Sequence, residues 1–248
     1  MVIEVCVDTV ASAIAAQSGG ASRIELCGSL IEGGITPSAG LIKLTRSAVS
    51  LPLHVMIRPR GGDFCYEPDE FETMAKDVAC AQKLGADGVV FGILTPNGTV
   101  DITRVRALVS QSRPLAITFH RAFDMTADLF RALDDVCSTG ADRVLTSGGE
   151  RTALLGSATI AQLVKHADNR IVIMAGSGIK PENARDFIEK TRVNEIHVGL
   201  RSSQPSPMLY QKQGISMGAL QGREYERSVV LEEEVRKLRV SVSHLGIS

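Results

Sequence analysis

The stretch CVDTVAS, residues 6–12, joins a short apolar run to an amphipathic one and contains no glycine. An open, doubly wound α/β sheet usually carries a glycine-rich turn at this first strand-to-helix junction, where it binds dinucleotide phosphates. A closed (β/α)8 barrel has no such requirement. The composition of this turn therefore favours a barrel over an open sheet.

Eight β-rich runs alternate with longer amphipathic runs, which is typical of βα units in a parallel sheet. Eight units in 248 residues match a TIM-like (β/α)8 barrel of the α/β class, which we predict as a single domain over residues 1–248. The predicted strands are residues 3–7, 23–27, 53–58, 88–92, 115–120, 143–147, 171–175 and 195–198.

Helix end signals follow two of these strands. The first helix is expected to end at Gly19 and Gly20, and the helix at residues 180–191 is expected to open with Pro181. After the eighth strand, residues 201–226 show no clear periodicity and predict a long loop, followed by a last helix over residues 228–244. Loops of this length are usually binding elements or interface arms.

The charge balance excludes several classes of partner. The 27 basic and 28 acidic residues are spread along the chain without a basic stripe, so nucleic acid is not an expected partner. No apolar run approaches the roughly 20 residues of a membrane helix, and no signal-peptide pattern opens the sequence. We expect a cytoplasmic protein without a membrane anchor. Five widely spaced cysteines without a CxxC motif predict reduced thiols: Cys6, Cys27, Cys65, Cys80 and Cys137.

Alternation within the strands predicts which side chains point into the barrel. One face of each of the first three strands is wholly aliphatic and should pack against the helices. The opposite faces carry polar groups that must be paired if they are buried. The interior should hold Glu4, Arg23, Glu25, Arg58, His120 and His197. Glu4, Arg23 and His54, early in their strands, are expected to form a structural ion-pair layer.

The C-terminal ends of barrel strands are where barrel enzymes keep their chemistry. The residues expected around this mouth are Asp8, Glu25, Cys27, Arg58, Arg60, His120, Arg121, Thr146, Ser147 and His197. We hypothesise catalytic roles for Glu25, Arg58 and His120, with His120 oriented by Glu25 or Asp124 as a general acid or base. Two interpretations of Arg58 stay open, an ion pair with Glu25 and a clamp on an anion.

Glycine-containing segments TSGG, MAGSGI and HVGLRSS end the last three strands. Barrels often bind phosphate at the loops after strands seven and eight, although glycines there also serve purely steric needs. The hypothetical anion-binding residues are Arg58, Arg60, Ser147, Gly148, Gly176, Gly178 and Arg201.

Cys6 and Cys27 should point inward from adjacent strands, which lie about 4.8 Å apart. Paired thiolates suit a soft ion such as Cu(I). The alternative is a pair of inert core thiols, which is common because cysteine is often buried.

Several ordered motifs, EVCVDT, RIELC, EGGITPS, MIRPRGGDFCY, TFHRAFDM, RVLTSG and SPMLYQKQGISMG, together resemble the CutC copper homeostasis family over residues 3–245. The resemblance implies a TIM-like barrel, a cytoplasmic homodimer or homotetramer, and a role in copper homeostasis with Cu(I) bound by Cys6 and Cys27. Met208 or Met217 is a further candidate ligand. The alternative hypothesis is a barrel enzyme acting on a small phosphate or carboxylate metabolite.

Overall fold

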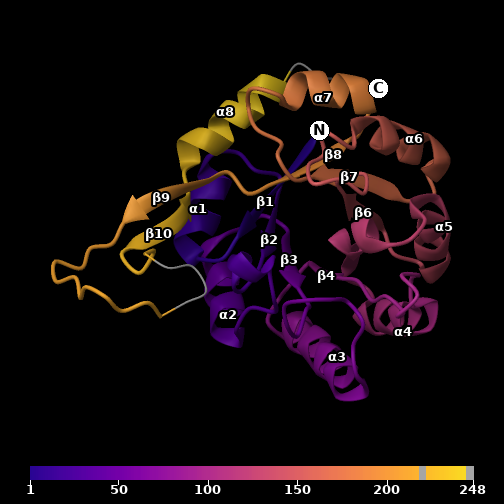
Figure 1. Ribbon diagram of the computed structural model, residues 1–248, viewed down its shortest axis with the longest axis horizontal. Coiled ribbons are helices and arrows are strands. Elements are labelled where there is room, and N and C mark those ends of the chain that lie inside the picture. The colour runs from indigo at the N-terminus through magenta and orange to yellow at the C-terminus, as the bar shows by residue number, and fades with distance from the viewer. Residues whose placement is uncertain (218–221, 244–248) are drawn as a thin grey trace.

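Eight parallel strands form a closed barrel with helices around it in the computed structural model, which describes residues 1–217 and 222–243 (Figure 1). The strands are β1 (Val2–Val7), β2 (Arg23–Leu26), β3 (Leu53–Met56), β4 (Gly88–Phe91), β5 (Ala116–Phe119), β6 (Arg143–Thr146), β7 (Val172–Gly176) and β8 (Glu195–Val198). They follow chain order, and β8 pairs back onto β1 with Val5 opposite Val198. The predicted TIM-like barrel is confirmed.

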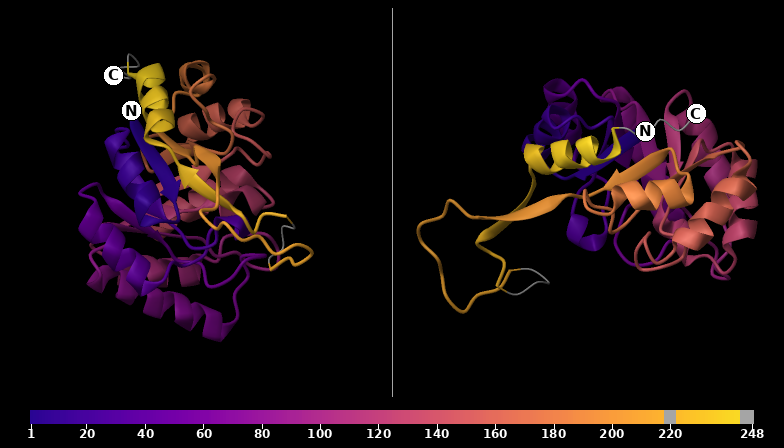
Figure 2. Two further views of the ribbon diagram at one scale, coloured as in Figure 1. Left: turned by 90° about the vertical axis from the view of Figure 1, so that its left-hand side faces the viewer. Right: turned by 90° about the horizontal axis from the view of Figure 1, so that it is seen from above.

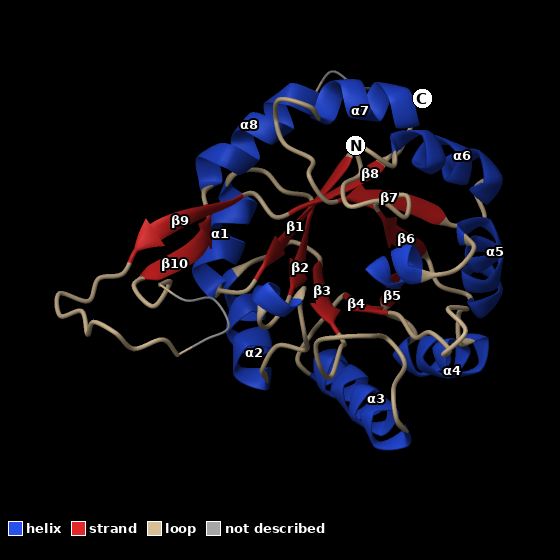
Figure 3. Cartoon of the chain, viewed as in Figure 1, coloured by secondary structure: helices blue, strands red, loops and turns tan. Residues whose placement is uncertain are grey.

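The helix ring covers the outer face of the barrel, as Figure 3 shows. It consists of α1 (Val10–Ser18), α2 (Ala39–Ala48), α3 (Pro68–Lys83), α4 (Ile102–Ser112), α5 (Leu129–Thr139), α6 (Ser157–Ala167), α7 (Ala184–Thr191) and α8 (Glu232–Val242). Two 3-10 turns, η1 (Leu30–Glu32) and η2 (Arg121–Met125), lie in the loops after β2 and β5.

The aliphatic faces of the strands point outward, as alternation predicts. Ile3, Val5 and Val7 belong to the main core between barrel and helices, whereas Cys6 of the same strand belongs to a separate small cluster with Cys27, Met56 and Val90. Burial of these outward aliphatic side chains is the main driving force that holds the helix ring on the barrel. The inward faces of the strands are therefore free to carry polar side chains inside the barrel.

Local signals at the ends of α1 agree with the sequence. The Thr9 side chain accepts a hydrogen bond from the backbone N–H of Ser12, which caps the helix, and Gly19 follows its last residue. Gly20 has a φ of 90°, a left-handed conformation that favours glycine. The prediction for α7 was less accurate, because Pro181 lies in a turn and the helix begins at Ala184.

The segment after β8 differs from the expected loop. It contains an antiparallel pair, β9 (Arg201–Pro205) and β10 (Glu226–Val230), which forms the base of an arm that projects from the barrel (Figure 2). The expected last helix was placed too early, since residues 228–230 complete β10 and α8 begins at Glu232. Its expected end, residue 244, lies outside the described residues. Both strands are mostly exposed and carry no apolar stripe, so the sequence contained no signal for this hairpin.

Within the described residues, no helix combines the length and the apolar character needed to cross a bilayer.

Candidate functional site

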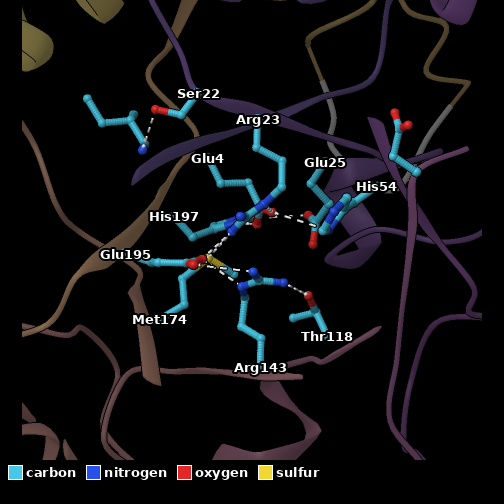
Figure 4. Close-up of polar contacts among 12 residues, drawn as sticks. Glu4, Ser22, Arg23, Glu25, His54, Thr118, Arg143, Met174, Glu195 and His197 are labelled. Carbon is cyan, nitrogen blue, oxygen red and sulfur yellow. Dashed lines mark hydrogen bonds and ion pairs between the residues drawn. The ribbon is translucent and has the colours of Figure 1, made fainter. Parts of the chain in front are cut away.

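A layer of ion pairs fills the lower part of the barrel, shown in Figure 4. Arg23 donates to Glu4 and Glu195, and Arg143 donates to Glu195 from the other side. All four side chains are buried, and His54 lies beside Glu4 with a nitrogen–oxygen distance of 3.8 Å. Because each buried charge has an opposite charge at contact distance, the expected structural layer is present.

Two thiols converge directly above this layer. Cys6 of β1 and Cys27, the residue after β2, place their sulfur atoms 3.8 Å apart, and both side chains are buried. Glu25 contributes a carboxylate oxygen 3.4 Å from the Cys27 sulfur. The parallel register sets Cys6 opposite Glu25, which explains why three residues from two strands meet at one point.

His197 of β8 links the ion-pair layer to the thiols. Its Nδ1 lies 2.7 Å from a Glu4 oxygen and its Nε2 lies 3.8 Å from a Glu25 oxygen. Burial lowers the pKa of His197, but the charge of Glu25 and the hydrogen bonds with Cys6 and Glu4 outweigh it and raise the pKa well above the usual value. The acidic partners therefore favour the protonated form of the ring.

The two thiols are electrostatically unequal. The hydrogen bond from Cys27, supported by His197, outweighs burial and holds the pKa of Cys6 well below its ordinary value. The same hydrogen bond, together with burial, raises the pKa of Cys27. Burial and the neighbouring charge of Cys6 raise the pKa of Glu25. Of the two thiols, Cys6 is thus the one whose environment favours the thiolate.

The methionine beside the thiols is not one of those expected. Met56 of β3 packs against Cys6 and Cys27. Met208 and Met217 lie on the projecting arm with exposed side chains, and neither lines the cavity that Cys6 lines. Alternation places Met56 on the inward face of its strand. This position in the sequence was the signal that could have identified it as a candidate ligand.

Arg58 follows β3 and is held by three backbone carbonyls. Its two terminal nitrogens donate to the carbonyl oxygens of Glu32, Gly34 and Gly62 at 2.7, 3.0 and 2.8 Å. Among the described residues, Arg58 makes no ion pair with Glu25, which instead faces Cys27 and His197. The ion-pair interpretation of Arg58 is therefore wrong, and the anion-clamp interpretation stays a hypothesis.

Arg60 lies apart from the barrel mouth. Its guanidinium donates to Glu70 and Asp63 and stacks on Tyr66, and it is absent from the lining of the mouth cavity. Arg58 points inward and Arg60 outward although only Pro59 separates them. Both were predicted to bind the same anion because they lie beyond the end of the strand, where alternation no longer distinguishes the direction of side chains.

The TSGG loop after β6 binds a carboxylate of the protein itself. Asp124 of η2 accepts hydrogen bonds from the backbone N–H groups of Ser147 and Gly149. It also accepts from the Thr146 hydroxyl, while the Gly148 amide donates to Thr146. Ser147 and Gly148 are therefore already engaged by internal partners, and Asp124 is committed to this loop rather than to His120.

His120, the residue after β5, is buried and packs its ring against Phe64. Its Nδ1 accepts a hydrogen bond from the Ala122 backbone N–H at 3.2 Å. Neither Glu25 nor Asp124 orients it, contrary to expectation, and its Nε2 has no protein partner within the described residues. Burial and the charge of Arg58 lower the pKa of His120 to about 3, so the ring is neutral near pH 7.

A cavity of about 260 Å³ opens at the barrel mouth. It brings together Cys6, Glu25, Arg58, His120 and His197, all at strand ends. Gly178 lines it from the loop after β7 and Arg201 from the start of β9, whereas Gly176 packs under His197 and Leu145. The apolar part of the wall is formed by Leu30, Met56, Phe64, Leu145, Ile179 and Val198.

Comparison with known proteins agrees with this architecture. The model of the CutC family matches residues 1–202. A CutC family protein of Bacteroides fragilis is 45% identical over 97% of this chain and 96% of its own length. A mouse copper homeostasis protein cutC homolog is 46% identical over 95% of this chain and 87% of its own length.

Among solved structures, a CutC protein from Streptococcus agalactiae superposes with a TM-score of 0.76 at 33% identity, covering 80% of this chain and 98% of that one. The match thus extends over the barrel and its mouth, where the thiols, His197 and Arg58 lie. On this evidence the chain belongs to the CutC family of copper homeostasis proteins.

Proposed function

We propose that this protein binds one Cu(I) ion between Cys6 and Cys27 and acts in copper homeostasis in the cytoplasm. The observation that carries the proposal is the buried pair of thiol sulfurs 3.8 Å apart. This separation is less than twice a thiolate–metal bond of roughly 2.3 Å, so a single ion can contact both sulfurs. The donors present therefore fit a soft metal ion.

The set of donors favours Cu(I) over zinc. Structural zinc is almost always held by four ligands, and its thiolate sites usually contain further cysteines or histidines. Here the two sulfurs and a carboxylate oxygen of Glu25 lie within 4.8 Å of one another. His197 also lies beside Cys6, but its Nδ1 is already engaged by Glu4. Thiolates are soft ligands that select Cu(I), and burial keeps the pair away from bulk water.

Titration of the reduced protein against a chromogenic Cu(I) chelator under anaerobic conditions tests the proposal. We expect the wild type to withdraw one Cu(I) per chain from the chelator. The Cys6→Ser/Cys27→Ser variant should lose this competition, because hydroxyls are hard ligands that bind Cu(I) poorly. X-ray absorption at the copper edge should show sulfur neighbours in the loaded wild type.

A matched control is offered by the cysteines outside the site. Cys80 and Cys137 are partly buried and free, so Cys80→Ser/Cys137→Ser removes the same number of thiols. We expect it to bind Cu(I) as the wild type does. Undiminished affinity in Cys6→Ser/Cys27→Ser, with circular dichroism showing a folded barrel, would contradict the proposal.

Location and assembly belong to the same proposal. All five cysteines are free, which suits the reducing cytoplasm. The arm between β9 and β10 carries exposed apolar side chains, Met208, Leu209, Tyr210, Ile215 and Met217. Clusters of exposed apolar residues on a projecting segment mark interaction sites. We infer that a second copy of the chain covers this arm in a homodimer or homotetramer.

A further inference from the structure

The cavity at the barrel mouth is larger than a copper site needs. Its volume of about 260 Å³ corresponds to several waters at about 30 Å³ each. The proposed copper donors occupy one side only, since Cys6 lines the cavity and Cys27 lies behind it. The remaining wall is a mixture of apolar side chains and a few polar groups, which is the composition of small-molecule sites.

His120 carries an unpartnered hydrogen-bond donor in the wall of this cavity. Because Nδ1 accepts from the Ala122 N–H, the single proton of the neutral ring is carried by Nε2. That Nε2–H is buried and has no partner among the described residues, and the His120 side chain lines the cavity. A buried donor without a partner costs stability, so an acceptor from a ligand is the expected complement.

Arg58 presents a positive charge to the same cavity. The Arg58 residue is 5% exposed, and within the described residues its guanidinium is bound by carbonyl oxygens instead of a carboxylate. In the same part of the chain its Nε–H has no partner. A buried cation held only by neutral dipoles is unfavourable until an anion joins it. The three carbonyls and the Phe64 ring, 4.9 Å from the guanidinium carbon, fix its position in advance.

The donors favour a carboxylate over a phosphate. The Arg58 and His120 side chains pack against the same ring, that of Phe64, and supply two N–H groups, which matches the two oxygens of a carboxylate. In the loop after β6, the amides of Ser147 and Gly149 are taken by Asp124 and are not free for a phosphate. The internal carboxylate therefore occupies one of the two regions where phosphate contacts were expected.

We propose that the mouth cavity binds a small organic carboxylate, whose oxygens accept hydrogen bonds from His120 Nε2 and Arg58 Nε. Arg201 at the rim adds positive charge near the entrance. The site uses neither thiol as a ligand, so it goes beyond the copper proposal and can fail or succeed independently of it. The chemical class it selects is a compact organic acid with an apolar portion that packs against Met56 and Leu145.

The test is a titration of the reduced protein with pyruvate and with succinate, followed by thermal unfolding and by NMR of 15N-labelled histidines. We expect a rise in melting temperature and a shift of the His120 Nε2–H resonance with at least one of the two acids. Inorganic phosphate at equal ionic strength should have a clearly smaller effect.

Variants separate this site from its surroundings. Arg58→Gln should weaken binding of the acid by about tenfold or more, since a charge-assisted hydrogen bond is lost. Arg60→Gln is the matched control, because Arg60 is two residues away but does not line the cavity; it should leave binding unchanged. Cys6→Ser/Cys27→Ser should retain acid binding even though we expect it to lose copper.

Three results would overturn the proposal: no response to either acid, an equal or larger response to phosphate, or equal weakening by Arg58→Gln and Arg60→Gln. If Arg58→Gln does not fold, the wild-type NMR spectrum still decides, because a proton on Nδ1 instead of Nε2 contradicts the donor assigned to His120. A wild-type protein that binds the acid but no Cu(I) would refute only the copper site.

Discussion

At the scale of single residues, the site is set by small differences in environment between similar groups. Arg58 is buried and bound by carbonyls, whereas Arg60 is partly exposed and paired with Glu70. Cys6 lines a cavity, whereas Cys27 is fully buried. Chemistry at this mouth therefore depends on which of two neighbouring, chemically identical side chains reaches it.

The burial of His120 predicts a pH dependence of stability. Its pKa is about 3 in the folded protein and about 6.5 when unfolded, so below pH 6.5 the unfolded state binds a proton that the folded state excludes. Above pH 7 this difference in proton binding does not affect stability. As the pH falls below 6.5, it lowers the free energy of unfolding increasingly. At pH 5 we expect a loss of about 2 kcal/mol from this group.

Urea unfolding at pH 7 and pH 5 measures this effect when wild type is compared with His120→Phe. Phenylalanine keeps an aromatic ring against Phe64 but cannot take up a proton. The variant should lose less stability between the two pH values than the wild type, by about 2 kcal/mol. Identical losses would show that His120 is not the titrating group.

At the scale of elements, the parallel register assembles the ion-pair layer from β1, β2, β6 and β8. Alternation within strands was sufficient to place Glu4, Arg23, Glu25 and His197 inside the barrel, because strand geometry has a fixed period of two. It failed for the partner of Arg58 and for the orientation of His120, since both residues follow their strands and are positioned by loops η1 and η2. Loop positions carry no such period.

Glu195 of β8 is the common partner of Arg23 and Arg143, so its charge holds three strands together. Glu195→Gln should lower the free energy of unfolding by about 3 kcal/mol, because two buried guanidinium groups lose their shared counter-charge. Glu72→Gln on α3 removes a charge from an exposed pair with Lys76 and should change stability by less than about 1 kcal/mol. Urea denaturation measures both, and equal effects would show that the layer is no stronger than a surface pair.

At the scale of the whole molecule, the closed barrel could be predicted from the sequence. Each of its eight βα units requires a β-rich run followed by an amphipathic run, and the sequence contains eight such pairs. The arm was not predictable in the same way. Residues 201–217 and 222–229 have no buried side chain, so no hydrophobic period reveals the β9–β10 hairpin. A segment whose apolar side chains are exposed resembles a loop in the sequence.

The arm makes a prediction about assembly. Leu209 is fully exposed, and Leu209→Asp should shift the protein from a homodimer or homotetramer toward the monomer in light scattering after size exclusion. Leu44→Asp on α2 is a matched control, because Leu44 is also exposed but lies on the helix ring. A monomeric wild type, or equal dissociation by both variants, would contradict a role for the arm.

The unequal depth of the two thiols has a kinetic consequence. Cys6 borders the mouth cavity and Cys27 has no exposed surface, so an ion that enters from the mouth meets Cys6 first and reaches Cys27 second. Loading would then proceed by ordered ligand exchange, with a donor's sulfur displaced one bond at a time. An organic acid bound beside Arg58 would block that route, and its dissociation would limit the rate of metal transfer.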